Sequence, residues 1–197
     1  SLFSLARIPE SLQYAEMVLE APVLEEAGEF FGHGLTSRLF AAHQSALALI
    51  HLGMEEEALQ RYNLAVELTE QLQDSFLRAN SLIEGLKFLR RRRDIPGALQ
   101  TADQLQCLLV ELDLPSYLIP ATHTRHWALM ESGRAAEVVE ATQDDLRRRE
   151  EFYPRVGLTA SYVATGLILA RAGHLEQAEE MLERGRAVVH QGGCLYE

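Results

Sequence analysis

The stretch HLGMEEEALQRYNLAVEL, residues 51–68, decides the fold, because RAGHLEQAEEMLERGRAVV at residues 171–189 has the same pattern. Each stretch has a glycine turn, then acidic residues, an alanine, and apolar residues at helical spacing. Acidic side chains are favoured in the first turn of a helix, where they face the positive end of the helix dipole. Apolar residues three and four positions apart are typical of an amphipathic helix. Both stretches therefore predict a turn followed by a helix.

The pattern recurs with a period of 40 residues, which indicates a repeat protein. The turn positions, each 40 residues after the last, are Gly53, Arg93, Gly133 and Gly173. The helix-packing positions five residues further on are Ala58, Ala98, Val138 and Ala178. Breaks between the repeats fall at Asp74, Leu114-Pro115 and Tyr153-Pro154. These marks in one register are hard to obtain by chance.

An echo of the pattern lies further upstream. RIPESLQYAEM from Arg7 matches DIPGALQTADQ from Asp94 at an offset of 87 residues rather than 80. We expect one or two extra helical turns between them, around Ala21-Pro22 or the GHG at residues 32–34. The sequence predicts a single repeat domain over 1–197: a partial repeat at 1–34, repeats at about 35–74, 75–114, 115–154 and 155–193, and the start of another at 194–197. Because the chain opens on Ser1, we expect it to be part of a longer protein.

Each repeat is predicted to contain two helices, A and B. In the first full repeat these are LTSRLFAAHQSALALIHL (35–52) and EEEALQRYNLAVELTEQL (55–72). No segment alternates apolar and polar residues as a strand would. The predicted fold is all-α, a right-handed α-α superhelix of stacked helical hairpins, in which each hairpin relies on its neighbours to bury its apolar face.

The pattern resembles the tetratricopeptide repeat (TPR), which combines small residues, a turn glycine and a large residue at fixed spacing. The first repeat supplies Ala46, Gly53, Ala58, Tyr62 and Ala65, and the fourth supplies Gly166, Gly173, Ala178 and Leu182, with Gly185 in place of the last alanine. The second repeat departs at Arg93, and the third departs at Val138, Thr142 and Asp145. The period is longer than usual for this family, which implies longer helices.

Three stretches are also similar to the TPR arrays of large bacterial signalling ATPases, of the adenylate-cyclase-linked or LuxR-type kind. They are ALMESGRAAEVV (128–139), LARAGHLEQAEEMLERGRAVV (169–189) and GGCLYE (192–197). The resemblance implies a sensor or interaction region in a multidomain signal-transduction or transcription-regulatory protein. The alternative is a stand-alone TPR scaffold that binds an acidic peptide of a partner protein.

The charge balance limits the partners. With 18 basic and 29 acidic residues and a net charge of -11, the chain is not expected to bind DNA, RNA or anionic membranes. No apolar stretch is long enough to cross a bilayer, and no secretory leader is visible. We therefore expect a cytoplasmic location, with Cys107 and Cys194 reduced. Cys107 lies among leucines of a helix B, where a buried, inert thiol is expected.

No motif indicates catalysis. The glycines of GHGLTSR, residues 32–38, lack the lysine and spacing of a phosphate-binding loop, and no nucleophile elbow is present. His123 and His126 are one helical turn apart, but no carboxylate or cysteine stands near them in sequence, so a metal site is not expected. We predict no enzymatic activity, no cofactor and no metal for this segment.

Four consecutive arginines, Arg90 to Arg93, stand at the predicted end of a helix A. Positive charge is favoured there by the helix dipole, so the run could be a solvated helix end. It could also contact an acidic partner or a nucleic acid.

In a TPR array the A helices line a concave groove. The residues projected onto this groove are His43, His51, Asn80, Lys87, Arg90, Arg91, His123, Trp127 and Arg171, together with apolar neighbours such as Phe40 and Ile83. The groove is therefore predicted to be basic and partly aromatic, which suits a peptide carrying carboxylates. Trp127 could instead be packed between helices. Exposed apolar repeat ends could also support a homodimer.

Overall fold

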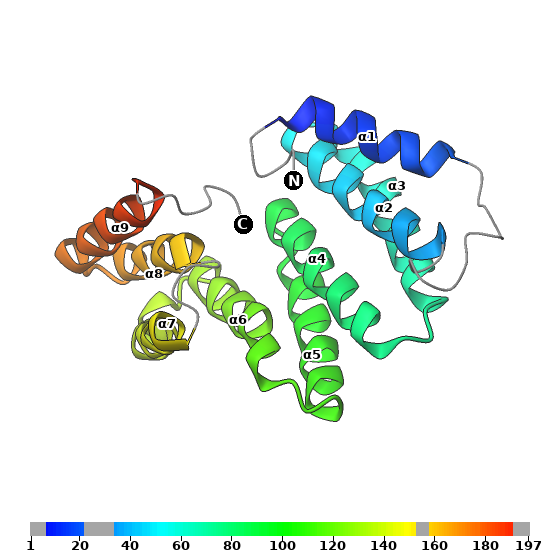
Figure 1. Cartoon of the computed structure of the whole chain (residues 1–197). Helices are drawn as coiled ribbons and strands as arrows, with labels where there is room; N and C mark the ends of the chain where they lie inside the picture. Colours follow the sequence, from blue (N-terminus) through cyan, green and yellow to red (C-terminus); the bar gives the residue numbers. More distant parts are fainter. Residues whose placement is uncertain (1–6, 22–33, 153–157, 191–197) are drawn as a thin grey trace. The chain divides into compact units, whose positions relative to one another are not determined.

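The computed structural model describes residues 7–21, 34–152 and 158–190, and all the regular elements in these ranges are helices (Figure 1). The α-helices are α1 (Ile8–Glu20), α2 (Gly34–His51), α3 (Glu55–Glu70), α4 (Ser75–Arg92), α5 (Ile95–Glu111), α6 (Ile119–Glu131), α7 (Val139–Phe152), α8 (Leu158–Arg171) and α9 (Leu175–His190). Two short 3-10 helices, η2 (Pro115–Leu118) and η3 (Ala135–Val138), precede α6 and α7. The extra turns are predicted around Ala21-Pro22 or residues 32–34, and the connecting residues 22–33 lie outside the described residues, as does the further repeat at 194–197.

The chain divides into two compact units, Ser1–Ala121 and Thr122–Glu197. Unit 1 contains α1 to α5, η2 and the first residues of α6, and unit 2 contains the rest of α6 together with α7, α8 and α9. In unit 1 the hairpins α2–α3 and α4–α5 follow one another, with α1 packed on α2 (Figure 1). In unit 2 the closest pair is α8 and α9.

The turn after each A helix confirms the 40-residue period. The four turn residues have positive φ angles: 78° at Gly53, 60° at Arg93, 76° at Gly133 and 90° at Gly173. In each turn the next amide bonds back to a carbonyl five residues earlier: Met54 to Leu49 at 3.0 Å, Asp94 to Leu89 at 3.0 Å, Arg134 to Leu129 at 2.8 Å, and His174 to Leu169 at 2.9 Å. This is the left-handed helix ending that favours glycine. At Arg93 the same geometry is imposed on an arginine.

The helix-packing positions are buried in all four repeats. Ala58 and Ala98 are 0% exposed, Ala178 is 3% exposed and Val138 is 5% exposed. Small side chains at these sites let helix B lie close to its neighbours, because close-packed interiors leave little room for larger ones. The predicted packing positions are therefore confirmed.

Two aspartates begin helices in unit 1. The Asp74 carboxylate accepts a hydrogen bond from the Leu77 amide at 2.8 Å, and the Asp94 carboxylate accepts one from the Gly97 amide at 3.0 Å. Each satisfies an amide that has no partner within its own helix. Asp94 follows Arg93 directly, so the arginine run ends α4 and leads straight into α5, as the sequence predicts.

Each unit has its own apolar core. In unit 1 one cluster joins α1, α2 and α3 around Leu39, Ala42 and Ala65, and a second joins α4 and α5 around Leu86 and Leu105. In unit 2 the core consists of residues from α7, α8 and α9: Leu146, Leu158, Tyr162, Leu169, Ala178 and Met181. α1 is also tied to unit 1 by polar contacts: Arg61 makes a two-pronged ion pair with Glu16 at 3.0 and 2.5 Å.

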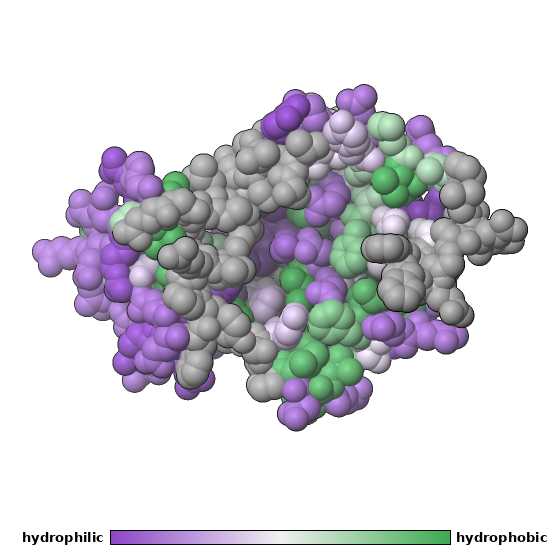
Figure 2. Space-filling model, in the orientation of Figure 1, coloured by the Kyte–Doolittle hydropathy of each residue, from purple (hydrophilic) through white to green (hydrophobic). Residues whose placement is uncertain are grey.

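The surface of unit 2 over α7 and α9 is mostly hydrophilic, whereas apolar side chains gather where α5 of unit 1 leads into η2 (Figure 2). Exposed apolar residues in that part of unit 1 include Val110 and Tyr117, and the Tyr117 ring meets Phe76 edge to face at 5.6 Å. Among the described helices none has the length and apolar character needed to span a membrane.

Candidate protein-interaction surface

Charge is segregated between the A and B helices of unit 1. The A helices α2 and α4 carry six basic residues and one acidic residue: Arg38, Arg78, Lys87, Arg90, Arg91 and Arg92 against Glu84. The B helices α3 and α5 carry seven acidic residues and one basic residue: Glu55, Glu56, Glu57, Glu67, Glu70, Asp103 and Glu111 against Arg61. An acidic protein therefore has a basic set of helices.

One stripe of α4 presents this positive charge. Asn80, Glu84, Lys87 and Arg91 are spaced three or four residues apart and so lie on one face of the helix. Lys87 is exposed and its ammonium donates to Glu84 at 2.8 Å. Arg91 is exposed and makes no hydrogen bond or ion pair with another described residue. This stripe can offer two cations to a ligand.

His51 and Asn80 extend the surface, although both are already hydrogen-bonded. Nδ1 of His51 donates to the Leu47 carbonyl at 2.6 Å, and the side-chain amide of Asn80 donates to the Phe76 carbonyl at 3.0 Å. His51 stands one period before Arg91, so the two occupy equivalent places at the ends of α2 and α4, which contact each other. We call His51, Asn80, Lys87 and Arg91 the A-helix surface.

His43 does not belong to this surface, contrary to the sequence-based expectation. Its side chain is only 2% exposed, because α4 packs against α2 at this point and places Ser81 2.8 Å from His43 Nε2. Burial, with a smaller contribution from the charge of Lys87, lowers the pKa of His43 to about 4. His43 is therefore a neutral, interior imidazole at pH 7.

Arg90 is turned further inward than Arg91. It is half-buried, and burial lowers the pKa of its guanidinium, with a further contribution from the charge of Arg91. Arg92 pairs with Glu55 at 3.4 Å. The arginines of the run thus have different surroundings, and of these three only Arg91 extends the exposed stripe of α4.

The remaining predicted groove residues lie in unit 2. His123 and Trp127 on α6 are half-buried, and Arg171 at the end of α8 is exposed. The four residues of the A-helix surface lie on α2 and α4, which contact each other in unit 1, whereas these three belong to the other unit. In the described parts of both units, no three His, Cys, Asp or Glu side chains come together in a way that could hold a metal ion.

His126, the partner of His123 in the HTRHW motif, has a structural role. It is buried, with Nδ1 2.9 Å from the Thr142 hydroxyl and 3.8 Å from the Asp145 carboxylate. Burial lowers the pKa of His126, and the nearby Asp145 acts in the opposite direction. The contact joins α6 to α7, which accounts for two of the third repeat's departures from the family pattern.

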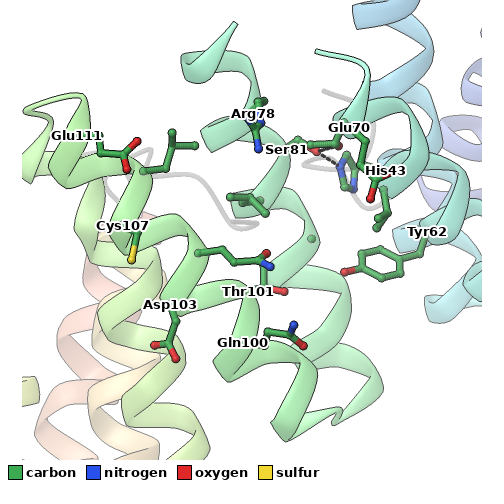
Figure 3. Close-up of a pocket in the computed structure, with 16 residues that line it drawn as sticks. His43, Tyr62, Glu70, Arg78, Ser81, Gln100, Thr101, Asp103, Cys107 and Glu111 are labelled. Carbon is green, nitrogen blue, oxygen red and sulfur yellow. Dashed lines mark hydrogen bonds between the residues drawn. The ribbon is translucent and has the colours of Figure 1, made fainter. Parts of the chain in front are cut away.

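A feature that sequence reasoning missed is a cleft between the B helices α3 and α5. It encloses about 840 Å³ and lies wholly within unit 1. Figure 3 shows Glu70 and Tyr62 of α3 on one side of it and Cys107 and Glu111 of α5 on the other, with Ser81 of α4 between them. Cys107 lies on its wall and is exposed, so the prediction of a buried thiol is wrong.

No family model and no curated protein matches this chain. Two solved structures are similar: crystal structures of a kinesin light chain-like protein of Podosopora anserina with nearly identical TPR-like repeats, one of them a Q17M variant. The TM-scores are 0.59 for the variant and 0.57 for the other, at 20% and 19% identity, and each match covers 95% of this chain and 89% of that chain.

The chain has a TPR-like repeat fold. The likeness to these structures, together with the helical hairpins and the four left-handed turns, confirms the predicted all-α fold of the superhelical repeat class. At this level of identity the likeness shows the fold alone.

Proposed function

We propose that this protein is a non-catalytic interaction module, whose A-helix surface binds an acidic segment of a partner protein. The observation that carries the proposal is the charge segregation in unit 1, which exposes Lys87 and Arg91 on one face of α4 in a chain of net charge -11. The TPR-like architecture supports it, because stacked hairpins create extended surfaces for binding.

The chemistry of the surface favours carboxylates. The guanidinium of Arg91 can donate two parallel hydrogen bonds to one carboxylate, while the Lys87 ammonium acts as a compact charge. Glu84 holds Lys87 on the stripe in the unbound protein. A ligand carboxylate can replace or share this contact. Since both cations are exposed, the attraction is screened by salt and affinity should fall as ionic strength rises.

The module is further proposed to act within a larger signal-transduction or transcription-regulatory ATPase and to report binding to its attached domains. Support comes from the similarity of residues 128–139 and 169–189 to the arrays of such proteins. The alternative is a stand-alone scaffold that uses the same surface. The full reading frame separates the two: nucleotide-binding motifs beside this segment support the first, and a chain with no other domain supports the second.

Fluorescence anisotropy with a labelled glutamate-rich peptide tests the A-helix surface. The double variant Lys87→Glu/Arg91→Glu turns two attractions into repulsions. Exposed charge pairs contribute about 0.2 to 1 kcal/mol each, so we expect the Kd to rise about tenfold.

The matched control is Arg147→Glu/Arg186→Glu, which makes the same change in net charge at exposed sites on α7 and α9. Its Kd should stay within about twofold of the wild-type value, because neither arginine belongs to the A-helix surface and the general attraction between exposed charges is screened by salt. Equal weakening by both double variants would show that only the overall charge matters and would remove the A-helix surface from the proposal.

A further inference from the structure

The cleft between α3 and α5 is kept open by small residues on α4. Ser81 and Gly85, four residues apart, lie along the part of α4 that faces the cleft. A Cβ at Gly85 would lie 3.5 Å from the Tyr62 ring, which stacks on Phe88 with ring centroids 4.5 Å apart. Tyr62 is thus held against α4, and the space beside it is left unfilled.

A chain of hydrogen bonds through Thr69 and Ser81 fixes which ring nitrogen of His43 carries the proton. The Thr69 hydroxyl donates to the Ala65 carbonyl at 2.7 Å, so it must accept from Ser81, with which it makes a short hydrogen bond. Ser81 in turn must accept from His43 Nε2, at 2.8 Å. Because neutral imidazole carries one proton, His43 Nδ1 is left as an acceptor.

That acceptor has no hydrogen-bond partner among the described residues, although it is buried. A buried acceptor without a partner costs about 1 to 3 kcal/mol. His43 is one of the residues that line the cleft (Figure 3). Because His43 is neutral at pH 7, it adds no positive charge to the cleft that it lines.

The rim of the cleft is acidic. Glu70 of α3 and Asp103 and Glu111 of α5 are exposed lining residues, against a single cation, Arg78. No lysine or arginine occurs in α5, and the one arginine of α3 is already paired with Glu16. Carboxylates around a recess focus negative potential into it. The cleft therefore favours a cation.

The lining also suits a long cationic side chain. Val66, Leu82 and Leu108 supply apolar surface within the cleft. Lysine and arginine cover such surface with their aliphatic stems while the charged end reaches polar groups. Because the acidic lining residues are exposed, a side chain projecting from a larger polypeptide can reach them.

We propose that this cleft binds a lysine- or arginine-bearing segment of a partner protein, as a second interaction site with a charge preference opposite to that of the A-helix surface. The proposal does not rest on the proposed function, since the two sites share no residue. The module then has two docking surfaces of opposite charge preference, one on its A helices and one between its B helices.

Cys107 provides the assay, because it lies on the wall of the cleft and is exposed. In a Cys194→Ser background it is the only thiol, and its alkylation by the neutral reagent N-ethylmaleimide can be followed by mass spectrometry. A lysine-rich peptide is expected to slow this alkylation at saturation, and a glutamate-rich peptide of equal length is not. Failure of the lysine-rich peptide to protect the thiol would overturn the proposal.

The variant Asp103→Asn/Glu111→Gln should raise the peptide concentration needed for half-protection by about five- to tenfold, as expected for two exposed charge pairs. The matched control is Glu176→Gln/Glu179→Gln, which removes two exposed carboxylates from α9. Equal effects of the two variants would contradict a specific site, as would protection by spermidine at the same concentration of positive charge.

Lys87→Glu/Arg91→Glu should leave protection undiminished, which separates this test from that of the A-helix surface. Circular dichroism melts confirm that each variant is folded.

Discussion

Lowering the pH from 7 to 5 is expected to destabilise the protein through His43, whose side chain is buried between α2 and α4. The pKa of this imidazole is about 4 in the folded protein, against an ordinary value of 6.5. Because the folded pKa is lowered, its contribution to stability is complete above pH 6.5. It is lost as the pH falls through 6.5 towards 4.

The size of the effect follows from the two pKa values. At pH 5 the unfolded chain carries a protonated His43, whereas the folded protein keeps most of it neutral. Linkage gives a loss of about 2 kcal/mol between pH 7 and pH 5. His126 contributes with the same sign, because burial also lowers its pKa. The contribution of His43 must therefore be isolated by comparison with a variant.

His43→Gln is the matched variant, because glutamine can donate to Ser81 and accept at its oxygen but does not titrate. Urea unfolding of both proteins, followed by far-UV circular dichroism at pH 7 and pH 5, gives the free energy of unfolding at each pH. Where more than one transition is seen, the one that the substitution shifts is compared. We expect the wild-type value to fall by about 2 kcal/mol more than that of the variant. Equal falls in the two proteins would refute the buried, neutral His43 described above.

Two further substitutions probe the repeat itself. Gly53→Ala should lower the free energy of unfolding by about 1 kcal/mol through backbone strain alone, since an added Cβ meets nothing within 4 Å; an unchanged urea midpoint would contradict the left-handed turn. Leu105→Ala, at a site that is 0% exposed in unit 1, should cost about 2 to 5 kcal/mol, whereas Val110→Ala on the same helix, at 66% exposure, should cost under about 0.5 kcal/mol.

The parts of the fold that could be predicted are those with a local and periodic cause. A left-handed turn favours a residue without a Cβ, so Gly53 and Gly173 stand out in the sequence, and the alanines five residues later are favoured by close helix packing. Arg93 shows the value of the period: its residue type argues against a left-handed turn, but its place in the register predicts one. Its φ of 60° confirms that prediction.

The burial of His43 could not be predicted in the same way. A helical projection places it about 80° around α2 from His51, at the border between groove and interior. Which side of the border it falls on depends on how closely α4 approaches α2. Because the side chain of Ser81 is small, α4 lies close enough to α2 for Ser81 and His43 to form a hydrogen bond.

The cleft was missed because it depends on the spacing between helices. Val66 and Cys107 have apolar neighbours in sequence, which favours burial, yet both are exposed. The periodic pattern places each of them on a B helix but contains no information on how far α3 stands from α5. The small residues Ser81 and Gly85 on α4 are the signal that could have indicated an unfilled space.

The most direct test of the central claim is to locate an acidic ligand on the molecule. A glutamate-rich peptide carrying a photo-reactive benzoylphenylalanine can be cross-linked to the wild-type protein, and the attachment sites identified by mass spectrometry of tryptic fragments. The A-helix surface predicts attachment within α2 and α4, close to Lys87 and Arg91. Attachment concentrated on α3 and α5 instead would contradict it.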